Sequence, residues 1–493
     1  MSSSQSDQPT LLDSLLRLPL VNKLAREVME CAPPRVFGVH GDWGAGKTSF
    51  LHQLHYTLDG IPSRKDWAAE QLKLVSGGFV NPTQLYEKSE DAVVVWFEAW
   101  RYQHEPAPVV ALLHEMRGQL GRLIRAKNWF KKIGEVTLCS ALLQLEQIAK
   151  FAWLQSAAGI TTVGKGSGLA TTIQEQGERW EREHLAEKLP AEALREQLEY
   201  AIKQCLGRQK GKDGERRRVV VLIDDLDRCE PQAAFRLLEG IKIYLNIPNC
   251  VFVLGMDQRI IEDAISESVP GADDDADLAR RRAREYLEKV FQAVYQLPIV
   301  QDVPDHLVAW LLEGETAISS DTGNTIRLLL IEYPGCVPAN PRKIKAFAAV
   351  LRRFLTEPNR ELVGDARFEP LAGYSGLATR HPYESLALIL ASCYHFHPQI
   401  YRVLEAHLDA FYEGLWEWCG RDKPEEQKDH PCMLGLGRAY VVRAPVGDRP
   451  AITLPEMYSL HADYSRGDIF RVQKLLYEAR PFTRKQILAL LLT

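Results

Sequence analysis

Residues 41–48 read Gly41-Asp42-Trp43-Gly44-Ala45-Gly46-Lys47-Thr48 and fit the pattern G-x-x-x-x-G-K-[ST] in full. The apolar segment 35–40 before it is typical of a buried strand, and the segment from Ser49 onward is typical of a helix. Glycines let backbone amides turn towards phosphate oxygens, and the N-terminus of a helix adds partial positive charge. The stretch therefore predicts a strand, a phosphate-binding loop and a helix in succession.

Two side chains of this loop have chemistry of their own. We expect Lys47 to neutralise the β- and γ-phosphates of a nucleotide, and the Thr48 hydroxyl to ligate Mg²⁺. The residues expected to contact the nucleotide through the loop are Gly41, Asp42, Trp43, Gly44, Ala45, Gly46, Lys47, Thr48 and Ser49.

Length and composition indicate what kind of protein this is. A chain of 493 residues predicts two or three domains, and 46% hydrophobic with 25% charged residues is typical of a globular protein. The net charge of −5 favours no general attraction to nucleic acid or anionic membrane. Nine cysteines without a C-x-x-C pair indicate a reducing compartment, so we expect a cytoplasmic location.

Apolar runs alternate with helical patterns along the first 300 residues. After the strand at 35–40, we expect strands at 91–97, 218–223 and 250–255 and helices at 10–29, 232–244 and 278–291, with Asp13 and Ser14 as candidate caps of the first helix. This alternation predicts an α/β fold, a doubly wound parallel sheet with ligands at the carboxyl ends of its strands.

A second motif follows the predicted strand at 218–223. Asp224 is the expected Mg²⁺ ligand there, and Asp225 the residue that orients or activates a hydrolytic water. Three aspartates within four residues repel one another unless a cation lies among them. Arg228 could supply that charge, or it could reach the γ-phosphate of a neighbouring subunit as an arginine finger.

These motifs together resemble the KAP P-loop NTPases, a family related to the STAND signalling ATPases. The segments that carry the resemblance occur in order within about residues 10 to 355: 41–48, 95–102, 223–229, 253–257, 286–292 and 340–345. The resemblance implies ATP and Mg²⁺ as ligands, Asp257 at a polar sensor position and Arg342 as a lid residue that reports the nucleotide state. Arg228 or Arg342 is expected to stabilise the charge that develops during hydrolysis. Glu98 stands where the family commonly has asparagine.

The resemblance also implies an insertion between the two motifs, often with transmembrane helices, and several bacterial members act in anti-phage defence. Here the apolar residues 136–164 are interrupted by Glu146 and Lys150, and neither half reaches the ~20 apolar residues of a spanning helix. A buried or partner-binding helical hairpin is therefore favoured over a membrane span, with peripheral membrane contact as the alternative.

The chain is expected to divide into six regions. They are 1–9 (disordered N-terminus), 10–104 (first part of the NTPase core), 105–215 (helical insertion), 216–300 (second part of the core), 301–358 (helical lid and sensor region) and 359–493 (helical C-terminal domain).

Three weaker signals favour structural interpretations. The run Cys393-Tyr394-His395-Phe396-His397 has soft metal ligands, but its aromatic residues favour a packed helix. The arginines of 280–284 are typical of a solvated face, and Trp416 and Trp418 are more typical of a core or partner interface than of base stacking.

The sequence therefore predicts ATP binding and slow Mg²⁺-dependent hydrolysis that switches conformation or assembly, with protein partners or a homo-oligomer. Two alternatives stay open. One is a nucleotide-gated scaffold that does not hydrolyse, and the other is a nucleic-acid-associated motor or clamp, which the net charge does not support.

Overall fold

The computed structural model describes residues 8–60, 63, 92–105, 108–126, 218–244, 250–268, 276–313, 318–332, 337–355, 381–396, 398 and 401. They fall into two compact units, Gln8–Pro298 and the described residues from Ile299 onward. The apolar segment 136–164 and the tryptophans at 416 and 418 lie outside the described residues.

A parallel five-stranded sheet organises the first unit, with the strand order β2-β3-β4-β1-β5. The strands are β1 (Arg35–His40), β2 (Ala92–Glu98), β3 (Arg218–Asp224), β4 (Cys250–Met256) and β5 (Ala293–Gln296). The four predicted strands are confirmed to within one residue at each end. The strand β5 was not predicted, because its four residues are only partly buried or exposed and make no apolar run.

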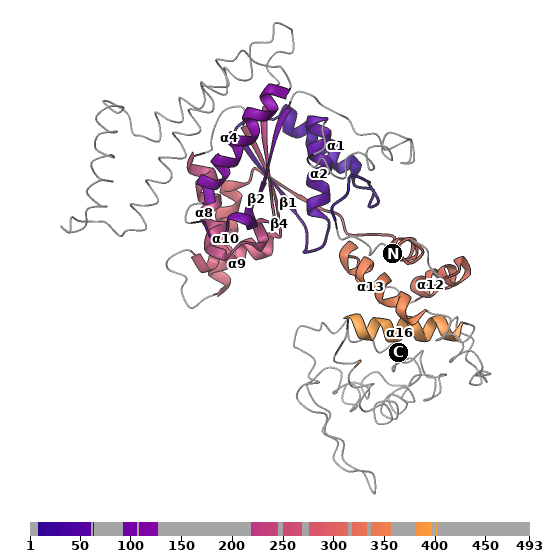
Figure 1. The fold of residues 1–493 in the computed structure, drawn as a ribbon. Helices are drawn as coiled ribbons and strands as arrows, with labels where there is room; N and C mark the ends of the chain where they lie inside the picture. Colours follow the sequence, from indigo (N-terminus) through magenta and orange to yellow (C-terminus); the bar gives the residue numbers. More distant parts are fainter. Residues whose placement is uncertain are drawn as a thin grey trace, which may run out of the picture. The chain divides into compact units, whose positions relative to one another are not determined.

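Helices cover both faces of this sheet (Figure 1). One face carries α1 (Leu18–Glu30) and α2 (Lys47–Asp59), and the other carries α4 (Pro108–Ala126), α8 (Pro231–Tyr244), α9 (Gln258–Ser268) and α10 (Ala276–Val290). Along β3, Val219 and Val221 belong to one core cluster, and Val220 and Leu222 belong to the other. This alternation confirms the doubly wound α/β fold.

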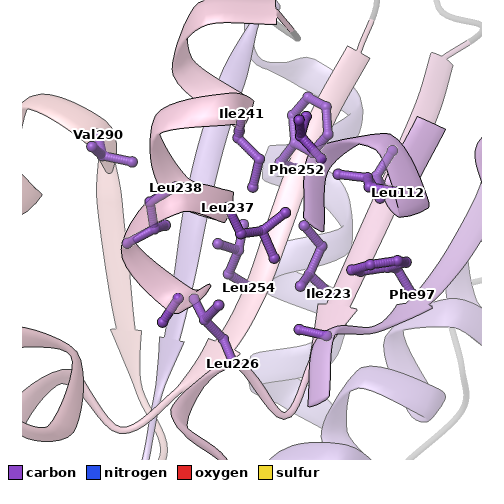
Figure 2. Close-up of a cluster of buried hydrophobic side chains, with 14 of the residues drawn as sticks. Phe97, Leu112, Ile223, Leu226, Leu237, Leu238, Ile241, Phe252, Leu254 and Val290 are labelled. Atoms are coloured by element: carbon purple, nitrogen blue, oxygen red, sulfur yellow. The ribbon is translucent and has the colours of Figure 1, made fainter. Parts of the chain in front are cut away.

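The larger core holds the two central strands in place. Figure 2 shows Ile223 of β3 and Phe252 and Leu254 of β4 against Leu237 of α8 and Leu112 of α4. Each side chain is at most 1% exposed, and burial of such a side chain stabilises the fold by about 1.5–3 kcal/mol. The carboxyl ends of β3 and β4 are therefore held by packing against the face of the sheet that carries α4 and α8.

The first helix begins later than predicted, at Leu18 instead of residue 10. Leu16 has a positive φ of 55°, which is not helical, and Pro19 fits only the first turn of a helix because it lacks an N–H. The carboxylate of Asp13 accepts hydrogen bonds from the backbone N–H groups of Arg17 (2.7 Å) and Leu18 (2.8 Å). Asp13 thus helps to fix the start of α1, but the N-cap residue is Arg17, and neither of the two candidate caps, Asp13 and Ser14, occupies that position.

The described regular elements of the second unit are all helices: α11 (Val303–Leu311), α12 (Ser320–Glu332), α13 (Pro341–Phe354) and α16 (Pro382–Phe396). Asn340 caps α13, because its side chain accepts a hydrogen bond from the Lys343 N–H (3.3 Å), and Pro341 occupies the first turn. The side chains of Phe347 and Phe396 join α13 to α16. In the parts of the chain that the structure describes, no helix has both the length and the apolar character to cross a membrane.

Candidate functional site

The strands β1 and β4 are paired side by side in the sheet, and the chain leaves their carboxyl ends in opposite directions. The chain after β1 leads to β2 on one side, and the chain after β4 leads to β5 on the other. Ligands of doubly wound sheets bind at the carboxyl ends of the strands at such a point. The predicted phosphate loop follows β1 there, and Gly41 N–H donates a hydrogen bond to the carbonyl of Met256 at the end of β4 (3.2 Å).

The loop has the backbone that its glycines allow. Gly44 and Gly46 have φ values of 82° and 89°, which other residues rarely adopt. The first hydrogen bond of α2 runs from the Phe50 N–H to the Gly46 carbonyl (3.1 Å). The N–H groups of the first turn therefore have no acceptor within the helix, which is the arrangement that binds a phosphate.

The Lys47 ammonium group lies beside the phosphate loop and contacts three oxygen atoms. Its Nζ atom contacts the carbonyl oxygens of Gly41 (2.8 Å) and Asp42 (3.3 Å) and lies 3.0 Å from Oδ2 of Asp227. The Lys47 and Asp227 side chains are 8% and 3% exposed. This contact of Asp227 was not predicted from the sequence, because it depends on the short helix η2 (Leu226–Arg228), in which Asp227 lies.

Asp224 ends β3 beside the start of α2. Its carboxylate accepts a hydrogen bond from the Thr48 hydroxyl, and its Oδ1 atom is buried without a hydrogen-bond partner among the described residues. Burial, with the neighbouring charge of Asp225, raises the pKa of Asp224 to about 7. A Cβ on Gly255 would lie 3.3 Å from that Oδ1 atom, so the glycine keeps the adjacent space open.

These observations fit the predicted Mg²⁺ site. A hydroxyl and an oxygen of a carboxylate that lacks a partner are ligands that Mg²⁺ prefers, and it usually takes few protein ligands together with phosphate oxygens. Thr48 and Asp224, the two predicted metal ligands, are in contact here.

Asp225 adopts a left-handed backbone conformation (φ 58°) and forms an ion pair with Arg228, whose Nε atom lies 2.8 Å from its Oδ1 atom. Burial raises the pKa of Asp225; the Arg228 charge opposes this rise, and the charges of Asp227 and Glu98 add to it. Arg228 therefore supplies the cation expected among the aspartates. Its guanidinium is bound to Asp225 of its own chain, so it would have to leave that carboxylate to act as an arginine finger.

Glu98 lies beside Asp224, because the two residues are partners in the register of β2 and β3. It forms an ion pair with Arg101 in the short helix η1 (Ala99–Tyr102). Four carboxylates thus lie at or just after the carboxyl ends of β2 and β3. Three of them, those of Glu98, Asp225 and Asp227, are paired with a cation, and the fourth is that of Asp224.

Asp257 follows β4, and it is the N-cap of α9, because its Oδ1 atom accepts a hydrogen bond from the Arg259 N–H (3.1 Å). The Arg259 guanidinium joins the carboxylates of Asp257 (2.9 Å) and Asp42 (2.6 Å). Burial opposes ionisation of Asp257, but its hydrogen bonds with Arg259 outweigh this and lower its pKa. The predicted sensor residue is therefore joined to the phosphate loop through Arg259.

Arg342 lies in the first turn of α13, which belongs to the second unit. In α16 the His395 ring contacts Phe347 and Phe396, which agrees with the packed-helix interpretation. The described residues contain no group of three or more His, Cys, Asp and Glu arranged to hold a metal ion.

The arginines of α10 contact carboxylates. Arg280 pairs with Asp263 (3.1 Å) and Arg284 pairs with Glu262 (2.9 Å), both on α9. This pattern supports the solvated-face interpretation of this helix.

Comparison with known proteins agrees with this geometry. A model of the KAP family P-loop domain matches residues 17–356, which is well over half of the chain. The match includes the phosphate loop, the segment from Asp224 to Arg228 and the start of α13. No curated protein matches the chain.

Proposed function

This chain belongs to the KAP family of P-loop domain proteins, and from that premise we propose that it binds ATP with Mg²⁺ and hydrolyses it slowly to switch its conformation or assembly. The observation that carries the proposal is the contact between Thr48 and Asp224 at the phosphate loop. One oxygen of that carboxylate is buried without a partner, as a metal ligand would be before it binds.

The phosphates would lie against the first-turn N–H groups of α2, with Lys47 neutralising their charge. Thr48 and Asp224 would hold Mg²⁺, which would supply further positive charge to stabilise the phosphates. Asp225 would accept a hydrogen bond from the attacking water. Its raised pKa brings the carboxylate closer to the range in which a general base works at neutral pH.

Two ion pairs favour a slow conformational switch as the role of ATP hydrolysis, in preference to rapid ATP turnover. Lys47 is held by Asp227, and Asp225 is held by Arg228. Both ion pairs have to rearrange, or each has to admit a further partner, before Lys47 can contact a phosphate and Asp225 can accept a hydrogen bond from a water molecule. A site that must first rearrange is suited to a slow, state-changing cycle, in which lid and loop motions often limit the rate.

We extend the proposal, on the family resemblance alone, to the choice of ATP over GTP and to the biological setting. That setting is a cytoplasmic bacterial complex with a role in anti-phage defence, related to STAND ATPases, in which the chain assembles with protein partners or with copies of itself. Arg342 would report the nucleotide state from α13.

The test is a single-turnover measurement of phosphate release from ATP by the full chain with Mg²⁺. Lys47→Ala should abolish tight nucleotide binding, and unchanged affinity would remove the basis of the phosphate-loop assignment. Because this substitution leaves the buried Asp227 charge without its partner, the double variant Lys47→Ala/Asp227→Asn is the matched control for folding.

Two further results would select an alternative. Tight ATP binding without phosphate release, even with candidate partners, would indicate the non-hydrolysing scaffold. Tight nucleic-acid binding with a steep dependence on salt concentration, measured by fluorescence anisotropy, would indicate the motor or clamp. Mass photometry with and without ATP measures the assembly step directly.

A further inference from the structure

Arg17 is a buried arginine next to the phosphate loop to which the proposed function assigns no role. It immediately precedes α1 and is 4% exposed. Its Nη1 atom donates a hydrogen bond to the carbonyl oxygen of Ala45, within the loop, and its Nη2 atom donates one to the carbonyl oxygen of Pro298 (2.7 Å). One guanidinium thus joins two backbone segments that are far apart in the sequence.

The position of this guanidinium is strongly determined. A buried charge is costly unless it is paired and hydrogen-bonded, and two carbonyl groups together with the nearby Asp13 carboxylate satisfy that requirement. Burial lowers the pKa of Arg17 to about 10, so the side chain stays charged at neutral pH. Asp13 also accepts the backbone N–H of Arg17, which fixes the main chain from which the guanidinium extends.

At one end the guanidinium lies directly behind the loop. A Cβ on Gly46 would lie only 3.2 Å from the Nη1 atom of Arg17, and Ala45 provides the acceptor carbonyl. A change in the backbone of Ala45 or Gly46 when phosphates bind would therefore alter the bond to Arg17.

At the other end lies the last residue of the first unit. Pro298 follows Leu297, whose N–H donates to the carbonyl of His40 at the end of β1 (2.8 Å), and it precedes Ile299, where the second unit begins. Within the second unit, the Val300 N–H donates to the carbonyl of Ala339 (3.4 Å), directly before Asn340, the cap of α13. The segment 297–300 is thus attached to β1 before the boundary and to the start of α13 after it.

We propose that Arg17 is a positioning residue that transmits the nucleotide state of the phosphate loop to the segment 297–300, and through it to α13. This role rests on the proposed function, because the signal is the binding of nucleotide phosphates. Lysine cannot replace arginine here, since only the planar fork of a guanidinium presents two donors in a fixed geometry to two separate carbonyls.

The experiment is hydrogen–deuterium exchange of the full chain with and without a saturating, slowly hydrolysed ATP analogue and Mg²⁺. In the native chain we expect slower exchange in the phosphate loop, and at Leu297 and Val300 a slowing of about fivefold or more, the lower end of usual coupling factors. In Arg17→Lys, at nucleotide concentrations that still saturate the loop, the loop remains protected and the change at Leu297 and Val300 is lost.

The matched control is Arg218→Lys. Arg218 is also buried and donates to a backbone carbonyl, that of Val28 (2.9 Å), but it lies at the amino end of β3, away from the loop. This variant should keep the nucleotide-dependent change at Leu297 and Val300, which separates transmission from a general loss of packing.

The outcomes are distinguishable. No protection of the phosphate loop in the native chain would overturn the proposed function, and this role with it. Protection of the loop without a change at Leu297 and Val300 would overturn the role of Arg17 alone, and this measurement needs no variant that must fold. An undiminished change in Arg17→Lys would overturn it as well.

Discussion

Lys47 and Asp227 form a buried ion pair, with 3.0 Å between Nζ and Oδ2, at the place where the phosphates of a nucleotide are expected. The other two ammonium hydrogens contact backbone carbonyls of Gly41 and Asp42. A phosphate oxygen can therefore reach this lysine only by replacing or sharing one of these three acceptors. The ion pair makes Asp227 a competitor of the nucleotide for the same cation.

Asp227→Asn should tighten nucleotide binding while it destabilises the nucleotide-free chain. The substitution leaves the buried Lys47 charge without its counterion, which costs about 3–5 kcal/mol in comparable pairs. Bound phosphates restore the missing negative charge. Calorimetry and thermal unfolding should show a lower Tm without ligand and a larger upward shift of Tm with ATP than in the native chain.

Asp263→Asn is the control for this experiment, because Asp263 pairs with Arg280 at an exposed position on α9 and α10. It should leave both the Tm and the ligand-induced shift nearly unchanged, as exposed pairs contribute about 0.2–1 kcal/mol. If Asp227→Asn weakens nucleotide binding, then Asp227 positions Lys47 for phosphate instead of competing with it.

Asp225→Asn should reduce hydrolysis by about 10²–10⁴-fold with little effect on nucleotide affinity, as expected for loss of a general base. Asparagine is the suitable replacement because it tolerates the left-handed backbone that Asp225 adopts. Single-turnover kinetics and a separate binding titration measure the two quantities independently. Hydrolysis at the native rate would remove Asp225 from the water-orienting role.

Much of the fold could be predicted from hydrophobic pattern alone. The strands β3 and β4 are buried on both faces, so each is a continuous apolar run bounded by polar residues. The edge strand β5 has no such run, because Val294 and Gln296 are exposed. The predicted start of α1 was too early, because the apolar periodicity begins before the helix does. Asp13 and Pro19 determine the true start of the helix.

The residues of the site likewise include some that could be predicted from the sequence and some that could not. The phosphate loop and Asp224 could be predicted because the loop directly follows β1 and Asp224 ends β3, so their positions in the sheet fix their positions in space. Asp227 and Arg17 could not be, because their contacts depend on the turn at η2 and on the irregular chain before α1. These tertiary contacts have no periodic pattern in the sequence.

Stability without nucleotide should decrease between about pH 4 and pH 7 because of Asp224. Burial, with the charge of Asp225, raises its pKa from 3.8 to about 7 in the folded chain. Between those two values the folded chain binds a proton that the unfolded chain releases, so this group favours folding at the acidic end, and its stabilising effect is lost as pH rises through about 7.

Asp224→Asn should therefore raise the Tm at pH 8 and flatten its dependence between about pH 4 and pH 7, since asparagine cannot ionise. Thermal unfolding of both chains across this range, without nucleotide, checks the sign. An unchanged slope in the variant would show that the Asp224 carboxyl does not titrate in this window.

Asp257 can be tested by two substitutions that separate its roles. Asp257→Ala removes the cap of α9 and should cost about 0.5–2 kcal/mol of stability. Asp257→Asn keeps a good N-cap residue but removes the charge that Arg259 joins to Asp42. If Asp257 senses the nucleotide, the asparagine variant should lose more than about tenfold in hydrolysis, equivalent to about 1.4 kcal/mol, with a small change in Tm. Native hydrolysis in that variant would leave Asp257 with a capping role only.

Trp43 should report nucleotide binding directly, because it lies within the phosphate loop and its side chain is 63% exposed. Bound phosphates bring negative charge next to the indole and fix the loop, so the intrinsic fluorescence should change on addition of ATP and Mg²⁺. Since the chain has ten tryptophans, the contribution of Trp43 is obtained by difference with Trp43→Phe, in which most of the change should be lost. Trp100→Phe is the matched control, because Trp100 is 49% exposed in η1, outside the loop, and this variant should retain the change. A nucleotide-dependent change that survives in Trp43→Phe would mean that the signal arises away from the loop.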